Sequence, residues 1–377
     1  GVLESEVSDP TDSNIVKRVF APTERISTYI TAVLAGEYFT VTDTYKPQSI
    51  TNSGDIPLVA YCRHSLKPHF DYDNIFRVTK NGLDFFQDLF DYPYPYPKYE
   101  QAFVPEYNIG AMENPGLVTF TEDFIFVSGA TEDDLEGRAN TICHEMAHMW
   151  FGDLVTMKWW DDLWLKESFA DFMGALGAIE ANGFNDAWVT FANHRKSWAY
   201  LQDQLPTTHP IVADIPHLEA AAQNFDGITY AKGASTLKQL VSYVGFDTFI
   251  EAARVYFKRF AWGNTSLQDF LDVLNEVSGR DMQTWSQAWL QTSGLSTLGT
   301  RRVYREDGKL QDLYLTQQLP DTQPAGIGRP HVVKLETFIL QEGKLVSTGT
   351  LSLEYPADPI AEYRVSLPQE HKKTVGE

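Results

Sequence analysis

Two predicted helices, residues 132–151 and 162–180, carry histidines and carboxylates beside large apolar side chains, a combination that a buried helix does not ordinarily contain. The first segment holds His144, Glu145 and His148 among large apolar neighbours. Burying two imidazoles and a carboxylate in such surroundings costs free energy unless a metal ion or hydrogen bonds compensate. We therefore expect these groups to share a partner inside the fold.

The spacing of these residues points to a metal ion. His144-Glu145-Met146-Ala147-His148 matches the pattern H-E-x-x-H. Residues four apart lie on one face of a helix, so two imidazoles in this register can hold one ion. The glutamate between them then points toward a water on that ion. Taken alone, the five residues are also compatible with a chance match on a solvated helix.

A second helix supplies a third ligand. Glu167 follows His148 after 18 residues (149 to 166), which is enough chain for a turn and an antiparallel return. Its neighbours are almost all apolar, so a solvated surface role is disfavoured. Two histidines, one glutamate and a water form the arrangement of a hydrolytic zinc site with one open position.

Composition and charge exclude several classes of protein. The apolar and charged fractions, 43% and 21%, are typical of globular domains, and no apolar run approaches the ~20 residues of a membrane span. The net charge of −21, spread along the chain, argues against partners such as nucleic acids or anionic membranes. We expect neither partner.

The two cysteines, Cys62 and Cys143, do not form a disulfide framework, which fits a reducing compartment. Cys143 precedes His144 by one residue and should face away from the histidine pair, as a small buried apolar side chain. The first residues, Gly1 to Glu6, lack the basic and apolar regions of a signal peptide. We therefore expect a cytoplasmic protein.

Residue periodicity predicts an order of strands, then helices, then strands. Strands are expected at residues 25–31, 38–42, 56–62, 102–105 and 117–121, helices at 74–90, 132–151, 162–180, 230–244, 247–260, 266–278 and 282–291, and strands again at 302–304, 310–315, 332–340 and 344–353. The prolines of residues 91–97 predict a stiff loop. After residue 293 the composition is that of a small all-β domain.

Other recognisable motifs accompany the zinc-binding pattern in the chain. Gly110-Ala111-Met112-Glu113-Asn114 lies upstream of it, and residues 103–106, 149–156 and 225–234 carry further motifs. Together these stretches resemble the aminopeptidase N family of gluzincin zinc metallopeptidases, and most closely its actinobacterial members. The resemblance runs through most of the chain. The combination of Gly110-Ala111-Met112-Glu113-Asn114 with the zinc-binding pattern is highly specific.

The resemblance implies an α+β fold in three parts. Residues 1–45 would be the C-terminal end of an N-terminal β domain. Residues 46–293 would form a thermolysin-like catalytic domain with a β-sheet lobe and a helical lobe. Residues 294–377 would form a small β-sandwich domain.

It also implies a mechanism. His144, His148 and Glu167 would hold one Zn²⁺, and Glu145 would act as general base and then general acid. Tyr230 matches the family tyrosine that donates to the tetrahedral oxyanion. Without the resemblance, a tyrosine opening an amphipathic helix is more often a packing residue.

Substrate recognition is assigned in the same way. Glu113 matches the glutamate that binds the free α-ammonium of a peptide, which would make the protein an aminopeptidase. Ala111 and Met112, with Gly110 and Asn114 of the same motif, would line the substrate backbone. Ile109 would shape the pocket for the first side chain.

The other histidines have no ligand spacing and are interpreted as structural or surface residues: His64, His69, His194, His209, His217, His331 and His371.

Two departures from the family pattern qualify the expectation. Lys166 stands where asparagine is more frequent, and we expect its side chain to point off the ligand face with little effect on zinc. Family members are normally continuous with a full N-terminal β domain and a C-terminal helical domain, both absent here. The chain is therefore expected to bind zinc but to be poorly active alone.

Three other functions remain open from the sequence. A thermolysin-like endopeptidase would share the zinc site but would not need Glu113. A non-catalytic, zinc-stabilised fragment or interaction module would not need Glu145. The leukotriene-hydrolase branch of the family is disfavoured because Ala111 follows the aminopeptidase N form of the motif.

Overall fold

The computed structural model describes residues 1–12, 14–48, 54–307, 310–322, 328–357 and 362–366. His371 lies outside these residues. The chain divides into two compact units: unit 1 comprises Gly1–Arg195 and Ile250–Val273, and unit 2 comprises Lys196–Phe249 and Leu274–Glu377.

Unit 1 contains a five-stranded mixed sheet. Its order is β3 (Tyr38–Tyr45), β4 (Ile56–Arg63), β5 (Tyr99–Val104), β7 (Val118–Thr121) and β6 (Ala111–Met112). The β3–β4 and β6–β7 pairs are antiparallel, whereas β4–β5 and β5–β7 are parallel. Every second side chain of β4 is buried, so one face of the sheet packs on the core. Strand β6, which carries Ala111 and Met112 of the predicted substrate motif, lies at the edge of the sheet.

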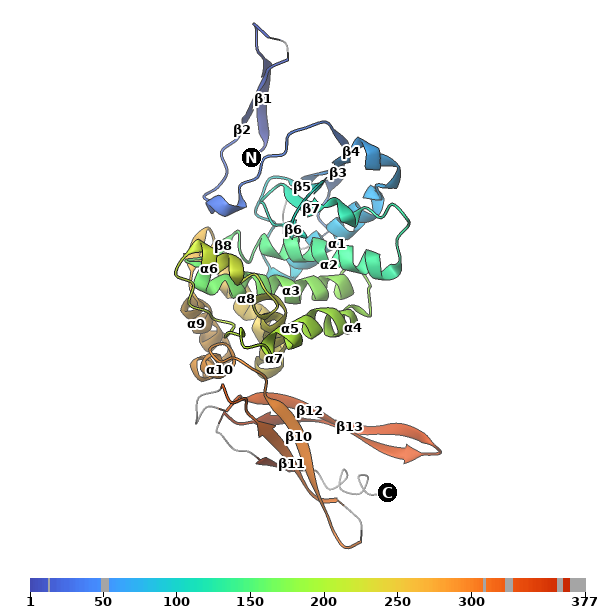
Figure 1. Cartoon of the computed structure of the whole chain (residues 1–377), viewed down its shortest axis with the longest axis vertical. Coiled ribbons are helices and arrows are strands. Elements are labelled where there is room, and N and C mark those ends of the chain that lie inside the picture. The colour runs from blue at the N-terminus through green and yellow to red at the C-terminus, as the bar shows by residue number, and fades with distance from the viewer. Residues whose placement is uncertain (13, 49–53, 308–309, 323–327, 358–361, 367–377) are drawn as a thin grey trace. The chain divides into compact units, whose positions relative to one another are not determined.

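Three helices pack together in unit 1: α1 (Tyr72–Phe90) and α2 (Glu132–His148), which contact this sheet, and α3 (Leu163–Glu180), which packs on α2. Helix α2 packs against both α1 and α3 (Figure 1). It begins with a capping box, in which Thr131 and Asp134 satisfy each other's backbone N–H groups. Helix α3 is buried on nearly all sides, which its almost uninterrupted apolar sequence requires.

Glycines allow α2 and α3 to approach closely. A Cβ atom on Gly174 would lie 3.0 Å from the backbone oxygen of Asn140, and one on Gly177 would lie 3.0 Å from Cys143 Sγ. Cys143 is buried beside Gly177 and Asn182, as expected for a packed apolar residue. Because His144 lies on α2 and Glu167 on α3, this close approach sets the distance between them.

An aromatic cluster forms the core of unit 1 below these helices. It joins α1, the end of α2, α3 and α8 (Phe246–Phe260) through stacked and edge-on rings. Its members include Phe86, Phe90, Trp150, Phe151, Phe169, Tyr256 and Phe257. Such rings bury large apolar areas and stabilise the helix packing around the polar cluster.

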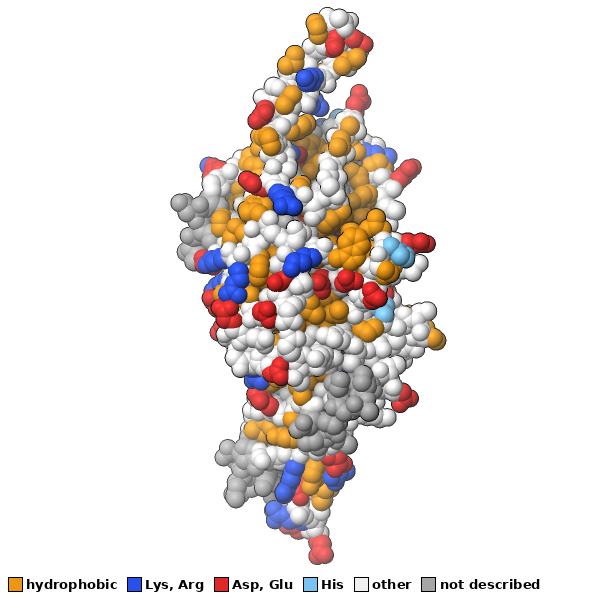
Figure 2. All heavy atoms as spheres, turned by 90° about the vertical axis from the view of Figure 1, so that its left-hand side faces the viewer, with side chains coloured by type: hydrophobic (Ala, Val, Ile, Leu, Met, Phe, Trp, Pro, Cys, Tyr) orange, Lys and Arg blue, Asp and Glu red, His pale blue; other side chains and the backbone are white. Residues whose placement is uncertain are grey.

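The remaining elements of unit 1 are short. They are the hairpin of β1 (Leu3–Ser8) and β2 (Val16–Phe20), the parallel pair β8 (Val155–Met157) and β9 (Gly263–Thr265), 3₁₀ turns at Thr28–Ile30, His64–His69, Glu122–Phe124 and Trp160–Asp162, α4 (Ala187–Thr190) and a π-helical turn at Phe191–Arg195. All residues of both hairpin strands are exposed. Figure 2 shows hydrophobic side chains on this hairpin at the top of the view.

Unit 2 combines helices with two small sheets. Its helices are α5 (Lys196–Asp203), α6 (Leu218–Gln223), a π-helical turn at Ile228–Lys232, α7 (Gly233–Val244) and α10 (Met282–Trp289), and α9 (Leu267–Ser278) ends in it. One sheet joins β10 (Thr297–Tyr304), β11 (Leu310–Gln318) and β14 (Glu362–Val365), and the other joins β12 (His331–Gln341) and β13 (Lys344–Tyr355). Leu310, Leu313, Leu315, Tyr355 and Val365 form a hydrophobic cluster.

A buried arginine fastens the segment after α10. The Arg329 side chain donates to the backbone oxygens of Ala288, Ser293 and Gly294 and to the hydroxyls of Thr292 and Ser296. Arg329 is only 2% exposed, so burial lowers the pKa of its guanidinium to about 10. Several acceptors around one donor group satisfy a charge that would otherwise be costly to bury.

The mixture of a sheet and helices bears out the predicted α+β class in its coarse form, and most predicted elements are present. The strand expected at residues 25–31 is wrong, because Thr28–Ile30 forms a 3₁₀ turn. The helix expected from residue 230 instead begins with the π-helical turn. The domain boundaries at residues 45 and 293 and the β-sandwich stay predictions. In the described residues, no helix has both the length and the apolarity needed to cross a bilayer.

We predict that Gly174→Ala destabilises unit 1 by about 1–3 kcal/mol, because the new methyl group would meet the Asn140 backbone oxygen. Gly137→Ala on α2 is the matched control, since its Cβ would meet no atom within 4 Å. The control should be neutral or stabilising, because alanine favours helix. Urea unfolding of both variants checks this, and equal midpoints would contradict close packing at Gly174.

Candidate metal centre

The three predicted ligands converge at one point between α2 and α3. His144 Nε2 and His148 Nε2 lie 3.2 Å apart. Glu167 Oε2 lies 3.6 Å from His144 Nε2 and 3.4 Å from His148 Nε2. A tetrahedral zinc ion with bonds of about 2.0–2.1 Å separates its ligand atoms by about 3.3 Å. The three distances therefore match the edges of such a site.

The other ring nitrogen of each histidine faces an acceptor. His148 Nδ1 lies 3.1 Å from the backbone oxygen of Phe151, and His144 Nδ1 lies 3.2 Å from Asp171 Oδ1. Arg195 in turn donates to both carboxylate oxygens of Asp171. Protons on the Nδ1 atoms leave the Nε2 lone pairs directed at the common centre. Sequence analysis missed Asp171, whose role depends on the packing of α3 on α2.

Three acceptors facing one another in a buried site call for a cation. His144, His148 and Glu167 are each at most 9% exposed. Burial opposes charge on His144, yet its bonds to Asp171 and Glu167 raise its pKa to about 10, so without a metal ion a proton on the imidazole would supply the positive charge. Burial would raise the pKa of Glu167, but Lys166 and His148 hold it well below its usual value. The donor set and its geometry fit a bound metal ion.

Glu145 lies at the same site. Ligand atoms of Glu145, His148 and Glu113 lie within 4.8 Å of one another. Burial raises the pKa of Glu145 to about 8, and the neighbouring Glu113 and Glu167 carboxylates act in the same direction. A buried carboxylate with a pKa near neutrality can both accept and return a proton.

The predicted substrate motif borders the cluster. Ala111 and Met112 form β6, and Glu113, directly after it, is 3% exposed. Asn114 is buried and donates to Thr119 Oγ1 on β7. The backbone oxygen of Gly110 accepts from Thr121.

Ile109 is 46% exposed, so its side chain is open to solvent in the described part of the chain.

The predicted direction of the Lys166 side chain is wrong, and the small effect on zinc stays a prediction. The Lys166 Nζ atom lies 2.6 Å from Glu167 Oε1 and 2.6 Å from Glu113 Oε1. The side chain thus turns into the site instead of away from it. Burial would raise the pKa of Glu113, but Lys166 and His148 lower it below its usual value.

A buried carboxylate that sequence analysis missed lies nearby. Neither oxygen of Asp153 accepts a hydrogen bond among the described residues, and the hydroxyls of Tyr29, Tyr96 and Tyr99 are likewise buried without one. Burial and the charge of Glu113 raise the pKa of Asp153 well above its usual value.

Tyr230 belongs to unit 2, where it lies in the π-helical turn Ile228–Lys232 near the rings of Trp198 and Phe225. Asp226 holds the start of this turn, because its Oδ1 accepts from the backbone N–H groups of Ile228 and Thr229.

His209, predicted to be structural, fixes Asp226. Its Nε2 lies 2.8 Å from Asp226 Oδ2, and its Nδ1 lies 2.7 Å from the Pro210 backbone oxygen. Both ring nitrogens thus face acceptors, which favours the imidazolium.

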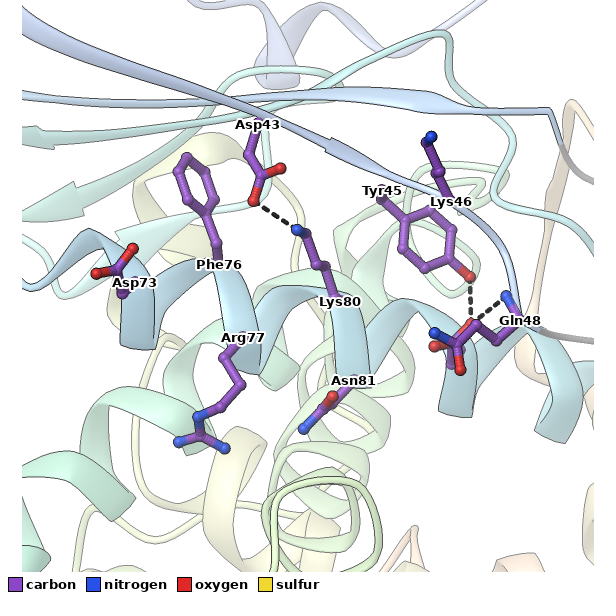
Figure 3. Close-up of a pocket in the computed structure, with 10 residues that line it drawn as sticks. Asp43, Tyr45, Lys46, Gln48, Asp73, Phe76, Arg77, Lys80 and Asn81 are labelled. Carbon is purple, nitrogen blue, oxygen red and sulfur yellow. Dashed lines mark hydrogen bonds and ion pairs between the residues drawn. The ribbon is translucent and has the colours of Figure 1, made fainter.

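A separate hollow of about 340 Å³ lies between β3 and α1 (Figure 3). None of the predicted site residues is among the described residues that line it. Lys80 pairs with Asp43 across the hollow, and the Tyr45 hydroxyl donates to Asp84. These contacts pair two of its carboxylates with neighbouring groups, which distinguishes the hollow from the candidate metal site.

Comparison with known proteins agrees with this geometry. Residues 75–289 match the sequence model of the peptidase family M1 domain. The chain belongs to peptidase family M1. It is 50% identical over 343 residues to Aminopeptidase N of Streptomyces lividans, covering 89% of this chain and 39% of that protein.

Other members of the family are more distant. The chain is 35% identical to Tricorn protease-interacting factor F2 of Thermoplasma volcanium, over 82% of this chain and 37% of that protein. It is 33% identical to Leucyl aminopeptidase of Saccharolobus solfataricus, over 73% of this chain and 34% of that protein. The chain thus spans less than half the length of these curated relatives.

Asp171→Asn should weaken metal binding by this M1 domain about 10–100-fold, because the amide orients the His144 ring less strongly. Competition with a chromogenic chelator measures the change. Glu180→Gln, at the exposed end of the same helix, is the control and should bind as the unmodified chain does. Equal affinities for the two variants would contradict a role for Asp171.

The His209–Asp226 pair should protect the Tyr230 turn in a pH-dependent way. The folded-state pKa of His209 is raised above 6.5 by Asp226 despite burial, and that of Asp226 is lowered below 3.8, chiefly by His209 despite burial. The His209 contribution is full below pH 6.5 and is lost as the pH rises through its folded pKa. The Asp226 contribution is full above pH 3.8 and is lost as the pH falls through its folded pKa.

Hydrogen-exchange protection factors of residues 226–232 test this expectation. His209→Gln should reduce protection more at pH 5 than at pH 9, while α10 should be unaffected at both. A difference of the same size at both pH values would refute the proposed ionisation.

Proposed function

We propose that this chain forms the catalytic part of a zinc-dependent aminopeptidase, which removes the N-terminal residue from peptides. The observation that carries the proposal is the buried cluster of His144, His148 and Glu167, with Glu145 and Glu113 at its border. Membership of family M1 and the names of several relatives support it.

Zinc is the metal that the donor set favours, since two imidazoles and one carboxylate with an open position are its hydrolytic arrangement. One ion per chain, held by His144, His148 and Glu167, would polarise the scissile carbonyl and make a water molecule acidic enough to react near neutral pH.

Glu145 takes the proton of the attacking water and returns it to the leaving amine. Its buried position and raised pKa suit both halves of this transfer. A divalent cation nearby would lower that pKa and favour the ionised base.

Glu113 binds the α-ammonium of the substrate, because a buried carboxylate rewards a free N-terminus and leaves an acylated one unpaired. Gly110, Ala111, Met112 and Asn114 align the peptide backbone along the edge strand β6. Ile109 contacts the first side chain.

Tyr230 donates to the oxyanion that forms during attack. Its place in a π-helical turn supports this assignment, because such turns are frequent at functional sites.

The flanking parts complete the proposal. Residues 1–45 belong to the end of an N-terminal β domain, residues 46–293 to the catalytic domain and residues 294–377 to a small β-sandwich. In the whole protein, this chain is continuous with a fuller N-terminal β domain and with a C-terminal helical domain. Two buried free thiols, Cys62 and Cys143, suit the reducing cytoplasm.

The family comparison favours an aminopeptidase over the endopeptidase and the non-catalytic module. The position of Glu113 agrees with this, since an endopeptidase would have no use for a buried carboxylate at the border of the metal cluster.

Turnover of a fluorogenic leucyl amide by the zinc-loaded chain, which we expect to be slow for this chain alone, tests the proposal. A chelator should abolish it, and N-acetylation of the substrate should do the same. Glu145→Gln should retain zinc, measured by plasma emission, yet lose about 10²–10⁴-fold in kcat. Glu132→Gln, exposed on the same helix, is the control. Cleavage of the acetylated substrate at an equal rate would identify an endopeptidase instead.

A further inference from the structure

A single buried ammonium joins the two carboxylates on either side of the site. Lys166 Nζ bonds Glu113 Oε1 and Glu167 Oε1, both at 2.6 Å. The side chains of all three residues are 4% exposed. Charge-assisted hydrogen bonds of this length in a dry environment are strong and directional.

The surroundings of Lys166 hold its long side chain in this one place. The ammonium lies 5.1 Å from the centre of the Tyr29 ring, in cation–π contact. Its stem packs beside Gly152, where an added Cβ would lie 3.4 Å from Lys166 Cδ. Gly152 has φ +132°, which strongly favours glycine, so the space for this stem is built into the turn.

The Lys166 ammonium binds one oxygen of each carboxylate, so the two oxygens of each group have different partners. Glu167 directs Oε2 toward the imidazoles of His144 and His148 and gives Oε1 to Lys166. Glu113 also gives Oε1 to Lys166, and no described residue donates to its Oε2. The second oxygen of Glu113 thereby remains for a further cation.

Without Lys166, the two carboxylates would face each other unscreened. Both now lie 2.6 Å from one nitrogen atom, so they are only a few ångströms apart, and like charges at such distances in a buried site repel strongly. Glu113 follows the short edge strand β6 rather than lying on a helix, so it is the partner that would turn away.

We propose that Lys166 is a positioning residue that ties Glu113 to the metal ligand Glu167 and so fixes where the site accepts a substrate ammonium. This inference rests on the proposed function, because it concerns the α-amine specificity of that site. In an α-amino acid the ammonium is two bonds from the carbonyl carbon, so a carboxylate held at a set place beside the metal selects that spacing.

The opposite role would be competition. The Lys166 ammonium resembles that of a substrate, and it could block Glu113 in the resting site. The geometry disfavours this, because Lys166 occupies only one oxygen of Glu113 and is itself held by Glu167. The two roles predict opposite changes in ligand affinity when Lys166 is replaced.

A pair of metal-binding probes separates amine recognition from catalysis. Leucine hydroxamate carries an α-ammonium, and 4-methylpentanohydroxamate is the same molecule without it. We expect calorimetry on the zinc-loaded full chain to show tighter binding of the amino compound. In Lys166→Met this advantage should fall at least about tenfold, the size of one charge-assisted hydrogen bond. Lys166→Arg, whose fork can reach both carboxylates, should keep part of it.

Lys158→Met is the matched control. Lys158 pairs with Asp269 at 3.4 Å, and its side chain is 59% exposed, so the same substitution there removes a surface charge only. It should leave the advantage of the amino compound unchanged.

A double-mutant cycle in the metal-free chain gives an independent readout. Lys166→Met should lower the thermal midpoint, and adding Glu113→Gln should restore much of the loss, because it removes one of the two repelling charges. Additive effects would contradict coupling between the two residues.

The outcomes are distinguishable. Equal affinity of the unmodified chain for both probes would refute α-amine recognition and with it the proposed function. If the unmodified chain prefers the amino compound and Lys166→Met keeps or increases that preference, the positioning role of Lys166 is overturned while the proposed function stands.

Discussion

The burial of mutually facing acceptors between two tightly packed helices is the constraint on which the site depends. His144 and His148 share a face of α2, and Glu167 meets them from α3. Nothing in an apolar core would hold three lone pairs together without a positive charge. The glycines that bring the helices close, and the aromatic cluster beneath them, fix the size of the space for that charge.

The part of the site predicted correctly from sequence is the part that depends on local geometry. The i, i+4 histidines need only a helix, and Glu167 needs only a second helix within reach. Asp171 and Asp153 could not be found in this way. Asp171 is one helical turn beyond Glu167 and has no motif, and the isolation of Asp153 is visible only once the chain around it is packed.

The two clear errors have separate physical causes. The side chain of Lys166 is expected to point off the ligand face, but four methylene groups let a lysine bend its ammonium far from the direction in which it leaves the helix. Residues 25–31 are rich in β-branched and aromatic side chains, yet a strand requires a neighbouring strand to pair with. Around Thr28–Ile30 the chain forms a 3₁₀ turn that buries Ile30 instead.

Composition marks the stretch around Ser293 and Gly294 as a junction between helices and strands. Its backbone nevertheless makes hydrogen bonds with a buried side chain, as a segment inside the fold does. The carbonyls there have as donor a guanidinium contributed by Arg329, some 35 residues further along the chain. A cut at this junction would strip them of that donor while leaving them inside the fold. The boundary proposed at residue 293 is therefore one across which buried polar groups are shared, so each side depends on the other for its hydrogen bonds.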